Sequence, residues 1–357
     1  MSEGPRTEEL RSGHTEISWS IVLDSALSRP LDPGEAQARI REAWPERTLG
    51  PAPAVVPTDR AGYQGTLTGM ADRPYAPGSS LGRVAVVGGE RPRLVVAGYH
   101  GALDGIGMLA LTEIAVGEPV RTLTRGVDPV LASRPATRRY LVERLLEALV
   151  APPSRFVPDT RGEDEGDHLL RLGLVAAEIR TPDLVAAAAR ALGRWNQGRG
   201  RATKRIVVAV GASRRPGSEA ALSEESAWFR FVLPHPDAET ARRVLRDAVP
   251  APRGSSALGR PVAGGVARAL AARTGSSFLV SSLGLLDPAG PVEAAALYPS
   301  VHGRSGIAVG AVTVGRTLTL TLRARRSEFS REGAMGILRM VSEELPDPPR
   351  PKGASPG

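Results

Sequence analysis

Apolar and polar residues alternate along several short segments of the chain, and this alternation predicts β-strands. In residues 17–23 two serines alternate with apolar side chains, and Thr317–Arg323 alternates in the same way. Further strands are expected where short apolar, partly β-branched runs are bounded by turn residues. These runs are Leu81–Val87, Arg93–Tyr99, Lys204–Val210, Phe229–Leu233, Ser277–Ser281 and Ile307–Val314.

Between these strands, an apolar period close to 3.6 residues predicts amphipathic helices. Asp32-Pro33 has the composition of a helix start, and so has Thr181-Pro182-Asp183, with Thr181 as N-cap and an acid in the first turn. The other helices are expected at Ile106–Val116, Ala136–Val150, Thr240–Val249, Val262–Thr274 and Arg331–Leu345. Strands and helices are mixed in both halves, so the pattern predicts an α/β fold.

A proline-rich, acidic stretch at residues 151–167 interrupts this pattern and is expected to link two lobes. The N-terminal lobe would span residues 16–150 and the C-terminal lobe residues 168–345, each a mixed sheet covered by helices. Residues 1–15 are expected to be a disordered leader, and residues 346–357 a Pro-rich tail.

Composition narrows the class of protein. The 357 residues are 41% hydrophobic, which suits two domains or one domain of two lobes. There is no cysteine, which excludes disulfides, thiolate metal sites and a cysteine nucleophile, and agrees with a reducing cytoplasm. No apolar run reaches the ~18 residues of a membrane span. The N-terminus lacks the apolar segment of a secretory signal, and no metal-ligand spacing is present.

The formal net charge is +8, and nearly all of the positive charge is arginine. A basic surface attracts polyanions. The arginines are nevertheless scattered, and 4% aromatic residues are too few for a base-stacking platform, so nucleic acid is not the expected partner. An acidic carrier protein or the phosphates of coenzyme A would suit the same charge, as would a general preference for arginine.

The segment whose residues are most suited to catalysis follows the predicted strand Arg93–Tyr99 and reads His100-Gly-Ala-Leu-Asp104-Gly105. A strand that ends here would place His100 at the edge of the sheet, facing a cleft between the lobes. Glycine permits the tight turn into the next helix and leaves backbone N–H groups open. Because an imidazole titrates near neutral pH, His100 is a candidate general base.

This His-x-x-x-Asp-Gly segment resembles the signature of the superfamily that holds nonribosomal peptide condensation domains, chloramphenicol acetyltransferase and polyketide-associated acyltransferases. The family pattern is His-His-x-x-x-Asp-Gly, so Tyr99 stands where the first histidine would be. The resemblance gives His100 the catalytic position, either as general base or, as in some condensation domains, by positioning and by electrostatic stabilisation of the tetrahedral intermediate. It gives Asp104 a structural role, facing an arginine and away from the substrate, and Gly105 a role in the turn, with an N–H near the oxyanion.

The resemblance continues along most of the chain. Lys204–Arg215 is similar to the strand and arginine-containing loop of the second lobe, and Val309–Leu322 to the final hairpin. Phe278–Gly284 resembles a Ser-Asn-x-Gly stretch, so Ser281 and Ser282 either hydrogen-bond the substrate or form a turn. His302 is expected close after this loop, and with Tyr99 it completes the candidate substrate-binding residues.

The family implies transfer of an acyl group from a carrier-protein or coenzyme A thioester to the amine or hydroxyl of a small acceptor. It implies a two-lobed chloramphenicol-acetyltransferase-like fold, no bound cofactor, no covalent acyl-enzyme and a setting in natural-product biosynthesis. Two alternatives stay open. Tyr99 and the short chain suit a repurposed member, such as a carrier-protein docking scaffold or a cyclisation factor. A loosely closed cleft would instead admit water and give a hydrolase.

Overall fold

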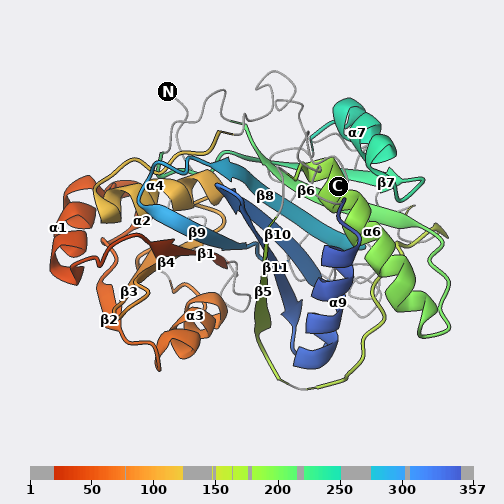
Figure 1. Cartoon of the computed structure of the whole chain (residues 1–357), viewed down its shortest axis with the longest axis horizontal. Helices are drawn as coiled ribbons and strands as arrows, with labels where there is room; N and C mark the ends of the chain where they lie inside the picture. Colours follow the sequence, from red (N-terminus) through yellow and green to blue (C-terminus); the bar gives the residue numbers. More distant parts are fainter. Residues whose placement is uncertain are drawn as a thin grey trace, which may run out of the picture.

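The computed structural model describes residues 20–76, 78–123, 147, 150–162, 164–175, 179–214, 221–250, 275–301 and 306–346. Several predictions made from the sequence lie outside these residues. They are the leader, most of the predicted helix 136–150, the predicted helix 262–274, His302 and nearly all of the Pro-rich tail. The described residues form two mixed sheets covered by helices, so the α/β two-lobed prediction is confirmed (Figure 1).

The first sheet has the strand order β2-β3-β4-β1-β9. Its strands are β2 (Val55–Thr58), β3 (Gly82–Val87), β4 (Arg93–Tyr99), β1 (Ser20–Leu27) and β9 (Val292–Tyr298). The helices that precede or follow them are α1 (Pro33–Ala43), α2 (Glu46–Leu49), α3 (Tyr63–Asp72) and α4 (Gly105–Val116). Apolar residues of α1 and α4 share one buried cluster with this sheet, and those of α3 share another. Both faces are therefore covered, which explains why β3 and β4 read as continuous apolar runs.

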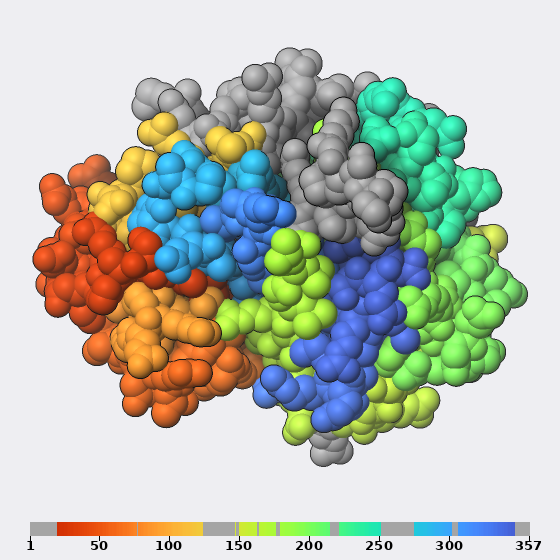
Figure 2. All heavy atoms as spheres, in the orientation of Figure 1, coloured from red at the N-terminus to blue at the C-terminus, as the bar shows by residue number. Residues whose placement is uncertain are grey.

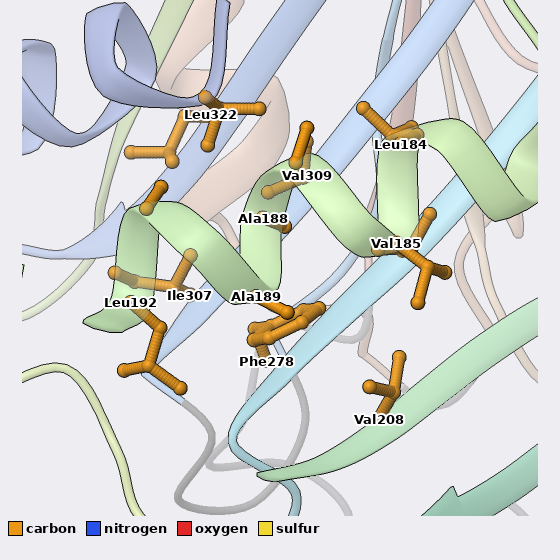
Figure 3. Close-up of a cluster of buried hydrophobic side chains, with 14 of the residues drawn as sticks. Leu184, Val185, Ala188, Ala189, Leu192, Val208, Phe278, Ile307, Val309 and Leu322 are labelled. Carbon is orange, nitrogen blue, oxygen red and sulfur yellow. The ribbon is translucent and has the colours of Figure 1, made fainter. Parts of the chain in front are cut away.

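The second sheet has the order β5-β11-β10-β8-β6-β7. Its strands are β5 (Asp167–Val175), β11 (Thr317–Arg325), β10 (Ile307–Val314), β8 (Phe278–Leu286), β6 (Ile206–Ser213) and β7 (Ser226–Leu233). Helices α6 (Thr181–Gln197), α7 (Ala238–Asp247) and α9 (Arg331–Glu343) belong to this half. Figure 3 shows how α6 covers the sheet, with Val185, Ala189 and Leu192 lying over side chains such as Phe278 of β8.

The two sheets meet in the middle of the molecule. In the space-filling view, residues of β5 in yellow-green lie between the orange residues around α3 and the blue residues of α9 (Figure 2). Strand β9 comes from the C-terminal half of the sequence but pairs with β1 in the first sheet. The pattern of apolar and polar residues does not predict this strand. The bounds of the lobes and linker stay a prediction, although residues 151–162 form no helix or strand and β5 begins at Asp167.

Two of the predicted helix starts can be compared with the structure at the level of single residues. Asp32-Pro33 opens α1 as predicted, and Asp32 is its N-cap, because its Oδ1 accepts from the Glu35 N–H at 2.8 Å. The N-cap prediction for Thr181 is wrong by one residue. Arg180 is the N-cap of α6, and its N–H donates to the Asp183 carboxylate at 3.2 Å. The acid three residues after the cap therefore satisfies the backbone at this end of the helix.

Candidate active site

The turn after β4 is set by its backbone and one buried side chain. The N–H groups of Ala102 and Leu103 both donate to the Tyr99 carbonyl at 2.9 Å, which closes a tight turn directly after the strand. Leu103 is fully buried between the sheet and α4. His100 is therefore held at the end of β4, at the edge where the sequence placed it, and it remains partly exposed.

Asp104 connects this turn to the second half of the chain. Its side chain is the N-cap of α4, with Oδ1 accepting from the Gly107 N–H at 2.7 Å. The other oxygen, Oδ2, accepts from the Glu225 N–H at 2.9 Å, and the Asp104 N–H approaches the Ser223 carbonyl at 3.4 Å. We call these contacts among Asp104, Ser223 and Glu225 the Asp104 bridge. Because the residue is only 2% exposed, this carboxylate has the surroundings of a structural group.

Gly105 and Gly107 let α4 approach its neighbours closely. A Cβ at Gly105 would lie 2.9 Å from Leu283 Cδ2 in β8, and one at Gly107 would lie 3.0 Å from the Ser223 carbonyl oxygen. The first contact is with the end of a flexible side chain, whereas the second is with backbone. Glycine at both positions therefore keeps the start of α4 in contact with the second sheet and with the loop before β7.

His100 lies against residues of the second half. Its ring centroid is 5.5 Å from that of Trp228 in β7, with the rings inclined by 60°. Burial lowers the pKa of His100 from its usual value near 6.5. The negative charge of Glu224 opposes this most strongly, followed by that of Asp104 and by backbone hydrogen bonds at Leu103 and at His100 itself. The net lowering of the pKa favours the neutral imidazole, which is the form a general base requires.

Four residues on adjacent strands of the second sheet are paired in register, beginning with Trp228 beside this histidine. Trp228 pairs with Gly211, Gly211 with Ser281, and Ser281 with Gly310. Neighbouring residues in register point to the same face, so the Ser281 side chain shares the face of Trp228, two strand spacings or about 10 Å away. Ser281 and Gly211 are partly exposed, and only the Ser281 hydroxyl lies within 3.5 Å of a Cβ built on Gly211.

The two serines lie inside β8, so the alternative that they form a turn is wrong. Ser282 is engaged within its own strand, because its Oγ accepts from the Gly284 N–H at 3.0 Å. Gly284 has a φ of 68°, and the pairing with β10 shifts register at this point. The Ser-Ser-Leu-Gly stretch is therefore an irregularity in a strand, which glycine permits at positive φ.

Tyr99 packs within the first lobe. Its ring makes an edge contact with Tyr75 at 5.7 Å between centroids, and burial raises the pKa of its hydroxyl. The guanidinium of Arg83 lies 3.8 Å over the Tyr75 ring on the other side. This packing gives Tyr99 a structural setting, and its contact with substrate stays a prediction, as does that of His302, which lies outside the described residues.

Sequence reasoning missed Glu224 and Trp228. The predicted strand began at Phe229, whereas β7 begins at Ser226 and alternates between partly exposed and buried side chains. Trp228 occupies a partly exposed position of that alternation, beside Ser226 and Arg230. A large aromatic residue on the polar face of a strand is the signal that would have found it.

Within the described ranges, no group of three or more histidine or acidic side chains is placed to hold a metal ion. Among the helices of those same ranges, none is long and apolar enough to cross a membrane.

Comparison with known proteins places the fold. No family model matches the sequence, and no curated protein is similar to it in sequence. Solved structures are similar in three dimensions. The first condensation domain of the calcium-dependent antibiotic synthetase, with a bound substrate analogue, aligns with a TM-score of 0.60 at 14% identity, over 94% of this chain and 93% of that chain.

Two more structures extend this likeness. The starter condensation domain of rhizomide synthetase in complex with C8-CoA aligns with a TM-score of 0.56 at 12% identity, over 92% of this chain and 91% of that one. The epimerization domain from the third module of tyrocidine synthetase B gives 0.51 at 10% identity, over 92% and 91%. The chain therefore has the two-lobed fold of condensation-type domains, and the likeness covers nearly its whole length.

Proposed function

We propose that the chain is an acyltransferase that moves an acyl group from a thioester to an amine or hydroxyl of a small acceptor. The observation that carries this proposal is the position of His100. It follows β4 of the first sheet, lies against Trp228 of the second sheet, and has a pKa lowered towards the neutral base. The fold alone would not argue for catalysis, because one fold hosts many functions.

The proposed reaction needs no covalent acyl-enzyme. The acceptor nitrogen or oxygen attacks the thioester carbonyl carbon while its proton passes to the neutral imidazole of His100. When the tetrahedral intermediate collapses, the C–S bond breaks and the imidazolium returns the proton to the departing sulfur. General base catalysis of this kind contributes about 10²–10⁴-fold. The Gly105 N–H lies in the first turn of α4, where backbone donors stabilise a developing oxyanion.

The proposed donor is an acyl group on coenzyme A or on a phosphopantetheinyl carrier protein, bound as co-substrate. The similar starter condensation domain was solved with C8-CoA. The net charge of +8 suits an acidic carrier protein or the phosphates of coenzyme A. The Ser281 hydroxyl, on the same sheet face as Trp228, is the proposed hydrogen-bonding group for the substrate. Synthesis of natural products in the cytoplasm is the proposed setting.

His100→Ala is the experiment that tests this function. The full chain is mixed with octanoyl-CoA or octanoyl-loaded carrier protein and a panel of amines and alcohols, and products are read by intact mass. We expect transfer by the unaltered protein and a loss of about 10²–10⁴-fold in His100→Ala. His235→Ala is the matched control, because His235 is exposed in the loop before α7. Near-normal transfer by His100→Ala would reject His100 as the base.

A repurposed, non-catalytic role is the second candidate, and the tyrosine at position 99 favours it. In that case the same mixtures would show carrier-protein binding without any new covalent product. Release of free octanoic acid without acceptor acylation would instead indicate a hydrolase. The three functions therefore give three different mass spectra.

A further inference from the structure

The loop before β7 comes from the other half of the chain and lies against the turn that carries His100. Ser223 and Glu225 are both held by Asp104, so Glu224 is fixed between two residues of the Asp104 bridge. Four residues further on, Trp228 packs its ring against His100. The histidine is therefore contacted, through Trp228, by a short segment whose start is held by Asp104.

The Glu224 side chain is itself oriented. Its Oε1 accepts from the Ser226 N–H at 3.0 Å and also from the Ser226 hydroxyl. Glu225 is turned elsewhere, because its Oε1 accepts from the Ser223 hydroxyl at 3.3 Å. The two adjacent glutamates thus have different surroundings, and they form a natural pair of test site and control.

We propose that Glu224 is the positioning carboxylate of His100, supplied by the second half of the chain, and that Asp104 acts only by holding the Glu224 loop in place. The Asp104 carboxylate already accepts hydrogen bonds from the backbone N–H groups of Gly107 and Glu225. These bonds reduce its electrostatic stabilisation of a protonated imidazole. Glu224 stabilises the imidazolium that forms when His100 takes the acceptor proton. This catalytic consequence rests on the proposed acyltransferase function.

The electrostatic surroundings of His100 agree with this assignment. Two charged side chains of the described residues act on the ring, Glu224 in the loop and Asp104 on the turn of His100. Glu225 and Arg214, which follows β6, lie in the segments that pack beside them. Arg214 is bound to the same loop, because its N–H donates to the Glu225 carbonyl at 2.7 Å. Among the charges that raise the pKa of His100, Glu224 acts more strongly than Asp104.

The first test needs no turnover. The protonation of His100 is followed by NMR in the full chain, with its resonance assigned by its absence in His100→Ala. Glu224→Gln keeps an oxygen that accepts from Ser226 but removes the charge. We expect the pKa of His100 to be lower in Glu224→Gln than in the unaltered protein, and unchanged in Glu225→Gln. An unchanged pKa in Glu224→Gln, or an equal shift in both variants, would overturn the proposal.

The second test measures the catalytic consequence. Glu224→Gln should lower kcat by about tenfold, the effect of roughly one pK unit of lost stabilisation, with KM little changed. The acidic limb of the pH profile should move to lower pH, and Glu224→Asp should restore part of kcat. Because the NMR titration measures His100 directly, it tests the Glu224–His100 interaction separately from the proposed acyltransferase function. A shifted titration without any acyl transfer would contradict the proposed function while leaving the Glu224–His100 interaction standing.

Discussion

Two of the junctions between the halves of this molecule use carboxylates in opposite ways. The Asp24 junction consists of Asp24 on β1, Arg93 on β4, Arg171 on β5 and Tyr63 on α3. Arg93 Nε and Arg171 Nη1 each donate to the fully buried Asp24 carboxylate at 2.7 Å, and the Tyr63 hydroxyl donates to it as well. Every described partner is a charged or hydroxyl side chain, so the charge is neutralised in place.

The His100 junction consists of His100, Asp104, Glu224 and Trp228. Here the buried carboxylate of Asp104 binds backbone N–H groups, and burial favours the neutral form of the neighbouring His100 by lowering its pKa. A buried ion pair fixes the relative position of its elements but is chemically inert. A histidine at the edge of the contact between the halves can exchange protons. The comparison indicates that the Asp24 junction aligns the two sheets, whereas the His100 junction has the groups that the proposed acyl transfer needs.

The largest expected effect comes from removing Asp24. Asp24→Ala leaves Arg93 and Arg171 without their buried counter-charge, which costs about 3–5 kcal/mol of unfolding free energy. Urea unfolding measures this loss. Asp32→Ala is the matched control, because it removes an N-cap of α1 near the surface and should cost only about 1 kcal/mol. Equal losses in the two variants would show that the Asp24 junction does not join the halves.

Asp104→Asn tests the other junction with a smaller effect. The Asn oxygen still caps α4 at Gly107, but its amide group meets the Glu225 N–H, and two donors then face each other. We expect a loss of about 1–3 kcal/mol in urea unfolding, the cost of an unsatisfied buried donor. Transfer activity should fall as well, because Glu224 is displaced. Full activity with full stability would mean that the Asp104 bridge is dispensable.

Gly107→Ala tests the same bridge through packing alone. The new Cβ would lie 3.0 Å from the Ser223 carbonyl, so the loop or α4 must shift. We expect a loss of about 1 kcal/mol or more in unfolding free energy, as for other tight core insertions. Gly65→Ala is the control. Gly65 lies within α3 with nothing within 4 Å of a Cβ, so this change should stabilise by about 0.5–1 kcal/mol.

The sequence predicted the turn of the His100 junction because all of its parts are local. An apolar strand, a histidine, an aspartate three residues before a glycine and a helical period lie within a short stretch around His100. The N-cap role of Asp104 follows from that order of residues. Strand β4 begins and ends where predicted, since its apolar run is bounded by Pro92 and His100.

The parts of the site contributed by distant segments could not be predicted in the same way. Trp228 packs against His100, and Glu224 lies in the loop before it, because β7 is an edge strand of the six-stranded second sheet. The role of Asp24 could not be predicted, because a single acid in an apolar strand forms a junction only when the fold brings Arg171 of the other half next to it. Strand β9 is missed for the same reason, because its pairing with β1 spans most of the chain.

The smallest expected effect concerns the pH dependence of stability. Burial lowers the pKa of His100 below 6.5, so below about that pH the unfolded chain binds more protons than the folded one. Stability should therefore fall as the pH drops through 6.5 towards the pKa of the folded state. His100→Gln should remove this part of the slope in urea unfolding between about pH 5 and 8. A residual slope is expected from His168, whose pKa is lowered as well by burial. If His100→Gln leaves the slope unchanged, the pKa of His100 is the same in the folded and unfolded chain. The His100 junction would then not favour the neutral imidazole through burial.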